Sequence, residues 1–93
     1  MNIRDSVWEV NKDALIAESF ELALIGYVEG NGRPAVALYD RFKCIDILIN
    51  RDGMQYDEAT EYFDYKIINA DVGENTPLFA TILKDLKNIY PCS

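Results

Sequence analysis

The order of segments between residues 35 and 80 constrains the fold of this chain most strongly. An apolar stretch at 35–39 precedes two segments with helical periodicity, which Asp52-Gly53 separates, and a Gly/Asn/Pro turn then leads into a second apolar stretch at 78–83. Strand-like stretches on either side of two helices are typical of an α+β domain. The chain has no histidine and this region has no pair of cysteines, so the pattern predicts a fold better than it predicts chemistry.

The predicted fold is a compact α+β domain, in which a small antiparallel sheet of about three strands packs against two to four helices. A glycine-rich turn at residues 30–34 is expected to join the first two strands as a hairpin. Strands are predicted at 20–28, 35–39 and 78–82, and a pair of helices at 39–50 and 56–68 on one side of the sheet. A helix over 13–25 is the main competitor of the first strand.

Local signals mark the helix ends. Ser6 fits the N-cap of a first helix that runs to about Ala17, with Asn11 as an alternative start and with Val7, Trp8, Leu15 and Ile16 on one side. Asp40 is suited to cap the next helix, and Gly53 is suited to end it because glycine accepts the left-handed conformation. Apolar residues at spacings of three and four predict the buried faces: Phe42, Ile45, Leu48 and Ile49 in that helix, and Ala59, Tyr62, Phe63 and Ile67 in the one after it.

The chain of 93 residues is expected to form a single domain over 1–93, with a core over about 20–82. Residues 83–93 are predicted to be a short helix or a tail. With 49% hydrophobic residues, the chain has enough apolar material for a core. The first residues do not predict a signal peptide, and no stretch is long and apolar enough for a membrane span.

The net charge of −7 excludes several classes of partner. Direct binding of nucleic acid needs clustered lysine and arginine, and an anionic membrane surface needs the same, so neither is expected. A basic protein surface would instead attract the chain. Cys44 and Cys92 are too few for a disulfide framework and are interpreted as reduced thiols in a cytoplasm.

No catalytic residue, cofactor or metal ligand set is predicted. Without histidine, neither a serine triad nor a typical zinc site can be assembled. Gly30-Asn31-Gly32 lacks the remainder of a phosphate-binding motif and is interpreted as a hairpin turn. Cys44 has no base to activate it and lies among apolar neighbours. The chain is therefore expected to be no enzyme, although a metal-dependent enzyme using Asp52, Asp57 and Glu58 is kept as a minor alternative.

The helix predicted at 56–68 carries a run of acidic and aromatic side chains. Carboxylates spaced three and four residues apart share one helix face, and tyrosine is favoured at binding surfaces. This face is the leading candidate for contact with a basic partner. Its predicted members are Tyr56, Asp57, Glu58, Glu61, Asp64 and Tyr65.

A second candidate site is the polar turn before the last strand. An acid, an amide and a hydroxyl in a tight turn offer donors and acceptors to a small polar ligand, such as a nucleotide signal. The predicted ligand-binding residues are Gly73, Glu74, Asn75 and Thr76, together with Arg33 or Arg41. The ligand would lie between subunits, so a homo-oligomer is part of this alternative.

Several segments of the chain together form a recognisable pattern. They are Ala23-Leu24-Ile25-Gly26, Ala37-Leu38-Tyr39-Asp40-Arg41-Phe42-Lys43-Cys44-Ile45-Asp46-Ile47-Leu48, Arg51-Asp52-Gly53-Met54, Glu58-Ala59, Glu61-Tyr62-Phe63 and Val72-Gly73-Glu74-Asn75-Thr76-Pro77-Leu78-Phe79. In these segments the chain resembles a family of small uncharacterised proteins of bacteriophages and other bacterial mobile elements. The resemblance covers about two thirds of the chain. It departs at residues 66–71, where an Asn two residues after the aromatic pair and an aromatic residue in place of Asp71 are expected.

This resemblance implies a cytoplasmic origin in a phage-infected or lysogenic bacterium, and it implies no activity. Together with the charge, it leads to the hypothesis of a non-enzymatic phage-type protein that occludes a basic surface of a host protein. A host protein that handles nucleic acid, or one that acts in defence, would present such a surface. Sequestration of a small molecule is the alternative function.

Overall fold

The structure of the chain is a computed structural model that describes residues 2–83. It confirms the α+β class and the three strands. The predicted C-terminal helix or tail lies outside the described residues except for Leu83, and so does Cys92. In chain order the elements are α1 (Ile3–Val10), the 3₁₀ helix η1 (Glu18–Ala23), β1 (Leu24–Gly30), β2 (Arg33–Asp40), α2 (Arg41–Asp52), α3 (Tyr56–Tyr62), the π-helical turn η2 (Phe63–Ile67) and β3 (Leu78–Ala80).

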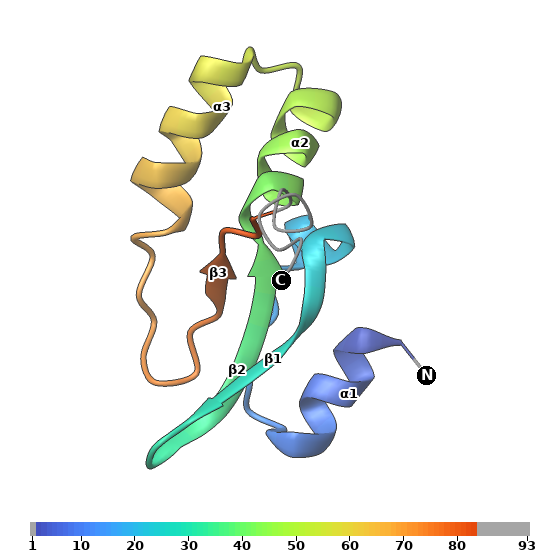
Figure 1. Ribbon diagram of the computed structural model, residues 1–93, viewed down its shortest axis with the longest axis vertical. Coiled ribbons are helices and arrows are strands. Elements are labelled where there is room, and N and C mark those ends of the chain that lie inside the picture. Colours follow the sequence, from blue (N-terminus) through green and yellow to red (C-terminus); the bar gives the residue numbers. More distant parts are fainter. Residues whose placement is uncertain (1, 84–93) are drawn as a thin grey trace, which may run out of the picture.

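The β1–β2 hairpin is the long arm of the molecule. Figure 1 shows it extending away from α2 and α3, which stand side by side at the end of the sheet where β2 stops, while α1 lies beside the hairpin. β1 and β2 pair antiparallel, with Gly30 opposite Arg33 at the tip. Gly32 has φ 65° there, a left-handed conformation that glycine adopts without steric cost. The predicted hairpin turn is therefore confirmed.

The third strand corrects the predicted strand direction. β3 pairs with β2 in parallel, with Leu38 opposite Leu78 and Asp40 opposite Ala80, so the sheet is mixed and not wholly antiparallel. After β2 the chain passes through α2, α3 and η2 before β3 begins. A crossover of this length is what a parallel pair requires, because a short hairpin cannot return the chain to the same end of the sheet. β3 is also shorter than predicted.

The first strand begins four residues later than predicted. Residues 18–23 form η1, which consists of two short 3₁₀ turns with a kink at Phe20, and the competing helix over 13–25 does not form either. Phe20 and Ala23 are buried, whereas Leu22 is 87% exposed. This burial pattern does not suit the alternation of a strand, in which residues 20 and 22 would share a face.

The first helix also lies earlier than predicted. α1 begins after Asn2, whose Oδ1 accepts a hydrogen bond from the Asp5 N–H at 2.9 Å, so Asn2 is the cap and Ser6 is inside the helix. Val7 is buried, as predicted. Trp8 is 40% exposed and its Nε1–H donates to the Ala14 carbonyl at 2.9 Å. The indole therefore fixes the chain after the helix and does not fill the core.

Both ends of α2 match the prediction. The buried Asp40 carboxylate accepts hydrogen bonds from the N–H groups of Phe42 and Lys43, and Gly53 ends the helix with φ 73°. Its buried residues are Cys44, Ile45 and Leu48. Phe42, predicted to be buried, is 39% exposed.

α3 and η2 form one continuous helical segment that ends in a wide turn. The Ile68 N–H donates to the Phe63 carbonyl at 2.9 Å, which is the spacing of a π-helix. Ala59 and Phe63 are buried, whereas Tyr62 is exposed and is not part of the predicted buried face. Phe63 meets Phe79 of β3 edge to face at 5.2 Å between ring centroids, and Phe79 lies 5.5 Å from the ring of Tyr39 on β2. These three rings join α3 to the sheet.

Candidate functional site

Five of the six residues predicted for the acidic face are exposed and lie together on α3 and η2. Tyr56, Thr60 and Asp64 follow one another at intervals of four residues, and Asp57, Glu61 and Tyr65 form a parallel row beside them. These six residues line one shallow surface depression and are called the acidic stripe below. Residues at such intervals are neighbours on a helix surface, so the local sequence alone places them together.

The two tyrosines at the ends of the acidic stripe are largely in solvent. Tyr56 is 60% exposed and Tyr65 is 76% exposed. Both rings belong to helices whose buried side is formed by Ala59 and Phe63, so the tyrosines contribute little to the core. Tyrosine is enriched at the surfaces by which proteins bind one another.

The carboxylates of the stripe are not equivalent. Asp64 accepts a hydrogen bond from Arg41 Nη1 at 2.6 Å, and the same guanidinium lies 5.0 Å from the Phe63 ring centroid. This hydrogen bond holds the pKa of Asp64 below its usual range. Asp57 and Glu61 make no ion pair among residues 2–83. The unneutralised charge of the stripe therefore resides on Asp57 and Glu61.

Glu58, which was assigned to the same face, lies apart from the stripe. Its carboxylate accepts a hydrogen bond from the Gln55 N–H at 3.3 Å, in the manner of a capping box at the start of α3. Thr60, which the sequence reasoning did not select, replaces it. The Thr60 hydroxyl is buried within the described structure and has no hydrogen-bond partner there. The i, i+4 spacing from Tyr56 through Thr60 to Asp64 is the sequence signal by which Thr60 could have been found.

The polar turn at residues 73–76 is held by internal hydrogen bonds. The Thr76 hydroxyl donates to the Gly73 carbonyl at 2.6 Å and accepts from the Val72 N–H at 2.9 Å. Asp71, where the resemblance leads us to expect an aromatic residue, accepts from the Gly73 N–H at 3.0 Å. These polar groups stabilise the turn itself, and Thr76 has little capacity left for a ligand.

Asn75 ties this turn to the N-terminal part of the chain. Asn11 Nδ2 donates to Asn75 Oδ1 at 2.9 Å and to the Ala35 carbonyl at 2.7 Å, and the Leu15 N–H donates to the Asn75 carbonyl at 3.3 Å. Glu74, by contrast, is exposed and makes no ion pair among residues 2–83. Asn75 therefore has a structural role between distant segments.

The two arginines proposed for the ligand site lie far apart. Arg33 starts β2 at the hairpin tip and is exposed, whereas Arg41 follows the other end of β2 and pairs with Asp64. A strand of this length separates them by roughly 25 Å. Within one subunit, therefore, at most one of these two alternative arginines can lie beside the turn.

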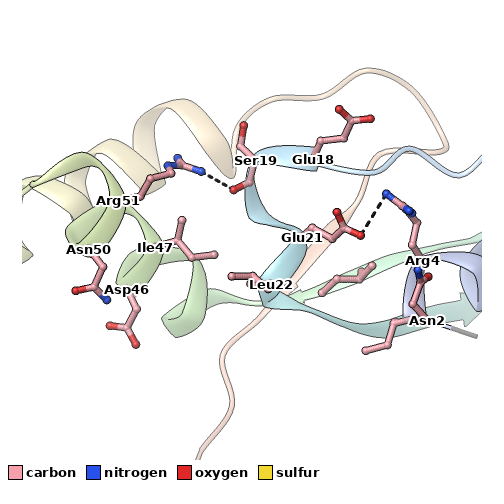
Figure 2. Close-up of a pocket in the computed structure, with 12 residues that line it drawn as sticks. Asn2, Arg4, Glu18, Ser19, Glu21, Leu22, Asp46, Ile47, Asn50 and Arg51 are labelled. Atoms are coloured by element: carbon pink, nitrogen blue, oxygen red, sulfur yellow. Dashed lines mark hydrogen bonds and ion pairs between the residues drawn. The ribbon is translucent and has the colours of Figure 1, made fainter.

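A groove that sequence reasoning missed lies between α1, η1 and α2. It has a volume of ≈ 910 Å³ and is walled by the start of α1, by η1 and by α2. Figure 2 shows Leu22 and Ile47 pointing into it, with Arg51 on the α2 side and Arg4 on the α1 side. The apolar residues that line it are Ile3, Leu22, Leu24 and Ile47. The sequence predicts a strand over residues 20–23, and this prediction gave no reason to expect that Leu22 is exposed.

A smaller apolar pocket of ≈ 360 Å³ lies beside the polar turn, and Val72 and Thr76 are among the residues that line it. Its walls come from the segment after α1, from the end of η2 and from the entry to β3. Lys66 is the one charged residue among those that line it. The full lining is Leu15, Ile16, Ala17, Phe20, Lys66, Ile67, Ala70, Val72, Thr76, Pro77 and Phe79.

Cys44 is buried, as predicted, and it is a free thiol. Burial raises the pKa of Cys44 to about 12, with a further contribution from the nearby Asp40 carboxylate. The side chain is therefore a thiol at neutral pH and a poor nucleophile.

The acidic residues proposed for metal binding do not gather into a ligand set. Within residues 2–83, no three acidic or cysteine side chains are grouped closely enough to hold a metal ion. Asp52 is instead bound by its neighbour Arg51 at 3.0 Å. The same residues contain no helix that is long and apolar enough to cross a membrane.

Comparison with known proteins does not add to this description. The chain matches no protein-family model, and neither the curated proteins nor the solved structures include a significant match.

Proposed function

We propose that this protein is a non-enzymatic binding protein of the bacteriophage type. Its acidic stripe would occlude a basic surface of a host protein that handles nucleic acid or acts in defence. The observation that carries the proposal is that Tyr56 and Tyr65 stand in solvent at the two ends of the acidic stripe, beside the carboxylates of Asp57 and Glu61, which make no ion pair among residues 2–83. The rings would supply contact area, and the charge would select a basic partner.

The net charge supports the same direction of recognition. A chain of charge −7 is drawn toward positively charged grooves over a distance of about 10 Å at moderate salt, and this attraction raises the association rate. Carboxylates spaced along a helix also resemble, in their negative charge, the row of phosphates in a nucleic-acid backbone. A basic groove that normally binds nucleic acid is therefore a suitable target for the stripe.

The test is a charge reversal confined to the stripe. We expect Asp57→Lys/Glu61→Lys to lose its partner, with affinity falling by about tenfold or more, because each lysine would face a basic surface. Asp64 is left unchanged, since its reversal would also break the ion pair with Arg41. Proteins retained from a bacterial lysate by immobilised wild type and variant are quantified by mass spectrometry, and the affinity of the partner is then measured directly.

The matched control is Glu9→Lys/Glu29→Lys, which changes the net charge equally on α1 and β1, away from the stripe. Both glutamates are exposed and make no ion pair among residues 2–83. The control is expected to keep the partner. If the stripe variant keeps the partner as well as the wild type does, the acidic stripe is not the binding site.

A second candidate function is sequestration of a small molecule. The apolar pocket of ≈ 360 Å³ beside Thr76 favours it, since small-molecule sites are concave and mostly apolar with few polar groups. Its lining suits an apolar ligand better than a nucleotide, because the polar groups of the adjacent turn already form hydrogen bonds with one another.

Thermal denaturation separates the two kinds of ligand. A ligand at about 100 times its Kd adds roughly 2.7 kcal/mol to the free energy of unfolding, and the melting temperature rises accordingly. We expect medium-chain carboxylates to raise the melting temperature and a panel of nucleotides to leave it unchanged. Ala70→Trp, which introduces an indole at the pocket wall, is expected to remove the effect. Unchanged melting with every carboxylate would eliminate this candidate.

A further inference from the structure

The groove between α1, η1 and α2 presents an unusual apolar side chain. Leu22 is 87% exposed, although its neighbours Phe20 and Ala23 are buried. Figure 2 shows the Leu22 side chain beside Ile47 in the groove, between the two arginine-bearing walls. Covering an exposed leucine side chain favours a complex, because apolar surface is removed from water. This position therefore offers binding energy that the described part of the chain does not use.

Both arginines of the groove already have partners within the chain. Arg4 pairs with Glu21 at 3.2 Å and lies 5.6 Å from the Trp8 ring centroid. Arg51 pairs with Asp52 at 3.0 Å, and its Nη1 donates to the Ser19 carbonyl at 2.6 Å. Their positive charge is therefore largely satisfied and would attract an acidic ligand only weakly.

The remaining charges of the groove are negative. Glu18 on η1 and Asp46 on α2 are exposed carboxylates that make no ion pair among residues 2–83. Figure 2 shows them on opposite walls, with Leu22 and Ile47 between them. The arrangement is an apolar centre flanked by free carboxylates.

We propose that this groove is a docking site for a basic amphipathic helix of a partner protein. Apolar side chains of that helix would cover Leu22 and Ile47, and its lysine or arginine residues would pair with Asp46 and Glu18. A helix laid into a groove presents anchors at intervals of three and four residues, and the volume of ≈ 910 Å³ accommodates more than one such side chain. This surface involves none of the residues of the acidic stripe.

The probe is a fluorescein-labelled synthetic helix about four turns long, with leucine on one face and lysine on the other. Two comparison peptides replace the leucines by serine or the lysines by glutamate. Fluorescence anisotropy at physiological salt measures binding to the full chain. We expect the leucine/lysine peptide to bind and both comparison peptides to bind at least about tenfold more weakly.

Variants of the protein locate the site. Leu22→Ser is expected to weaken binding of the leucine/lysine peptide by about tenfold or more, and Asp46→Asn by a few-fold. Since Leu22 is so exposed, its replacement leaves the denaturation midpoint unchanged, and chemical denaturation checks this. Leu15→Ser replaces an exposed leucine outside the groove, and Asp57→Asn removes a stripe carboxylate. Both controls are expected to bind the peptide as the wild type does.

Three results would overturn the proposal. The first is that Leu22→Ser binds the leucine/lysine peptide as tightly as Leu15→Ser does, which would show that the peptide does not bind in the groove. The leucine/glutamate peptide could bind equally well, which would exclude a basic partner. Sedimentation could show a wild-type dimer that Leu22→Ser dissociates, which would make a second copy of the chain the occupant.

Discussion

Replacing Tyr39 by alanine is expected to lower the free energy of unfolding by about 4 kcal/mol or more, close to the total stability of many small domains. Tyr39 is fully buried on β2, and its ring packs beside Phe79. Its hydroxyl accepts a hydrogen bond from the Ala17 N–H at 2.7 Å. Alanine would leave a large cavity and an unpaired N–H group. Chemical denaturation followed by far-UV circular dichroism measures the loss.

Tyr39→Phe separates the contribution of the hydroxyl group from that of the ring. It keeps the ring and removes the acceptor for the Ala17 N–H, so we expect a loss of about 1–3 kcal/mol. The remainder of the alanine effect belongs to packing of the ring. If the Tyr39→Phe variant is as stable as the wild type, the Tyr39 hydroxyl does not hold the segment after α1 against the sheet.

Phe63→Ala is expected to lower the free energy of unfolding by about 3–5 kcal/mol. Phe63 is fully buried where α3 passes into η2, and it meets the edge of Phe79 and the guanidinium of Arg41. Its loss would remove the main apolar contact between the helix that carries the acidic stripe and the sheet. Chemical denaturation of wild type and variant under the same conditions measures the difference.

The control for this prediction is Tyr65→Ala, two residues further along the same helical segment. Tyr65 is 76% exposed, so its replacement should change stability by no more than about 0.5 kcal/mol. Tyr65→Ala should instead weaken binding of the partner if the acidic stripe is the site. Equal destabilisation by the two substitutions would mean that the α3 side facing the sheet has been misassigned.

The effects of the Tyr39 and Phe63 substitutions are also expected to be coupled. Both rings contact Phe79, so a cavity on one side of that ring changes the packing on the other. Substitutions that share a contact residue commonly deviate from additivity. The small β3 strand thus contributes to stability mainly through one side chain placed between α3 and β2.

Features that depend on neighbouring residues were predictable from the sequence. Asp40 caps α2 with its own carboxylate, and Gly53 ends that helix with φ 73°, because each reports a backbone conformation that its residue type favours. The hairpin turn at Gly32 belongs to the same class. The acidic stripe was largely predictable too, because helical spacing alone brings its members to one face.

Features that depend on distant residues were not predictable. The mainly apolar residues at 20–23 suit a strand, a helix or a 3₁₀ turn, and the packing of Phe20 and Ala23 selects the last of these. The pairing of Asp64 with Arg41 joins η2 to the first residue of α2, and no local pattern announces it. The groove around Leu22 arises from three segments that fold together, so it was missed entirely.

By itself, the sequence determined the α+β class, the hairpin, the caps of α2 and the helical face on which carboxylates and tyrosines collect. Each of these follows from interactions within a few residues of the chain. The tertiary structure alone decided the parallel direction of β3, the hydrogen bonds within the polar turn, the ion pair of Asp64 with Arg41 and the exposure of Leu22. These depend on which distant surfaces bury one another, and that choice is made by the packing of the whole core.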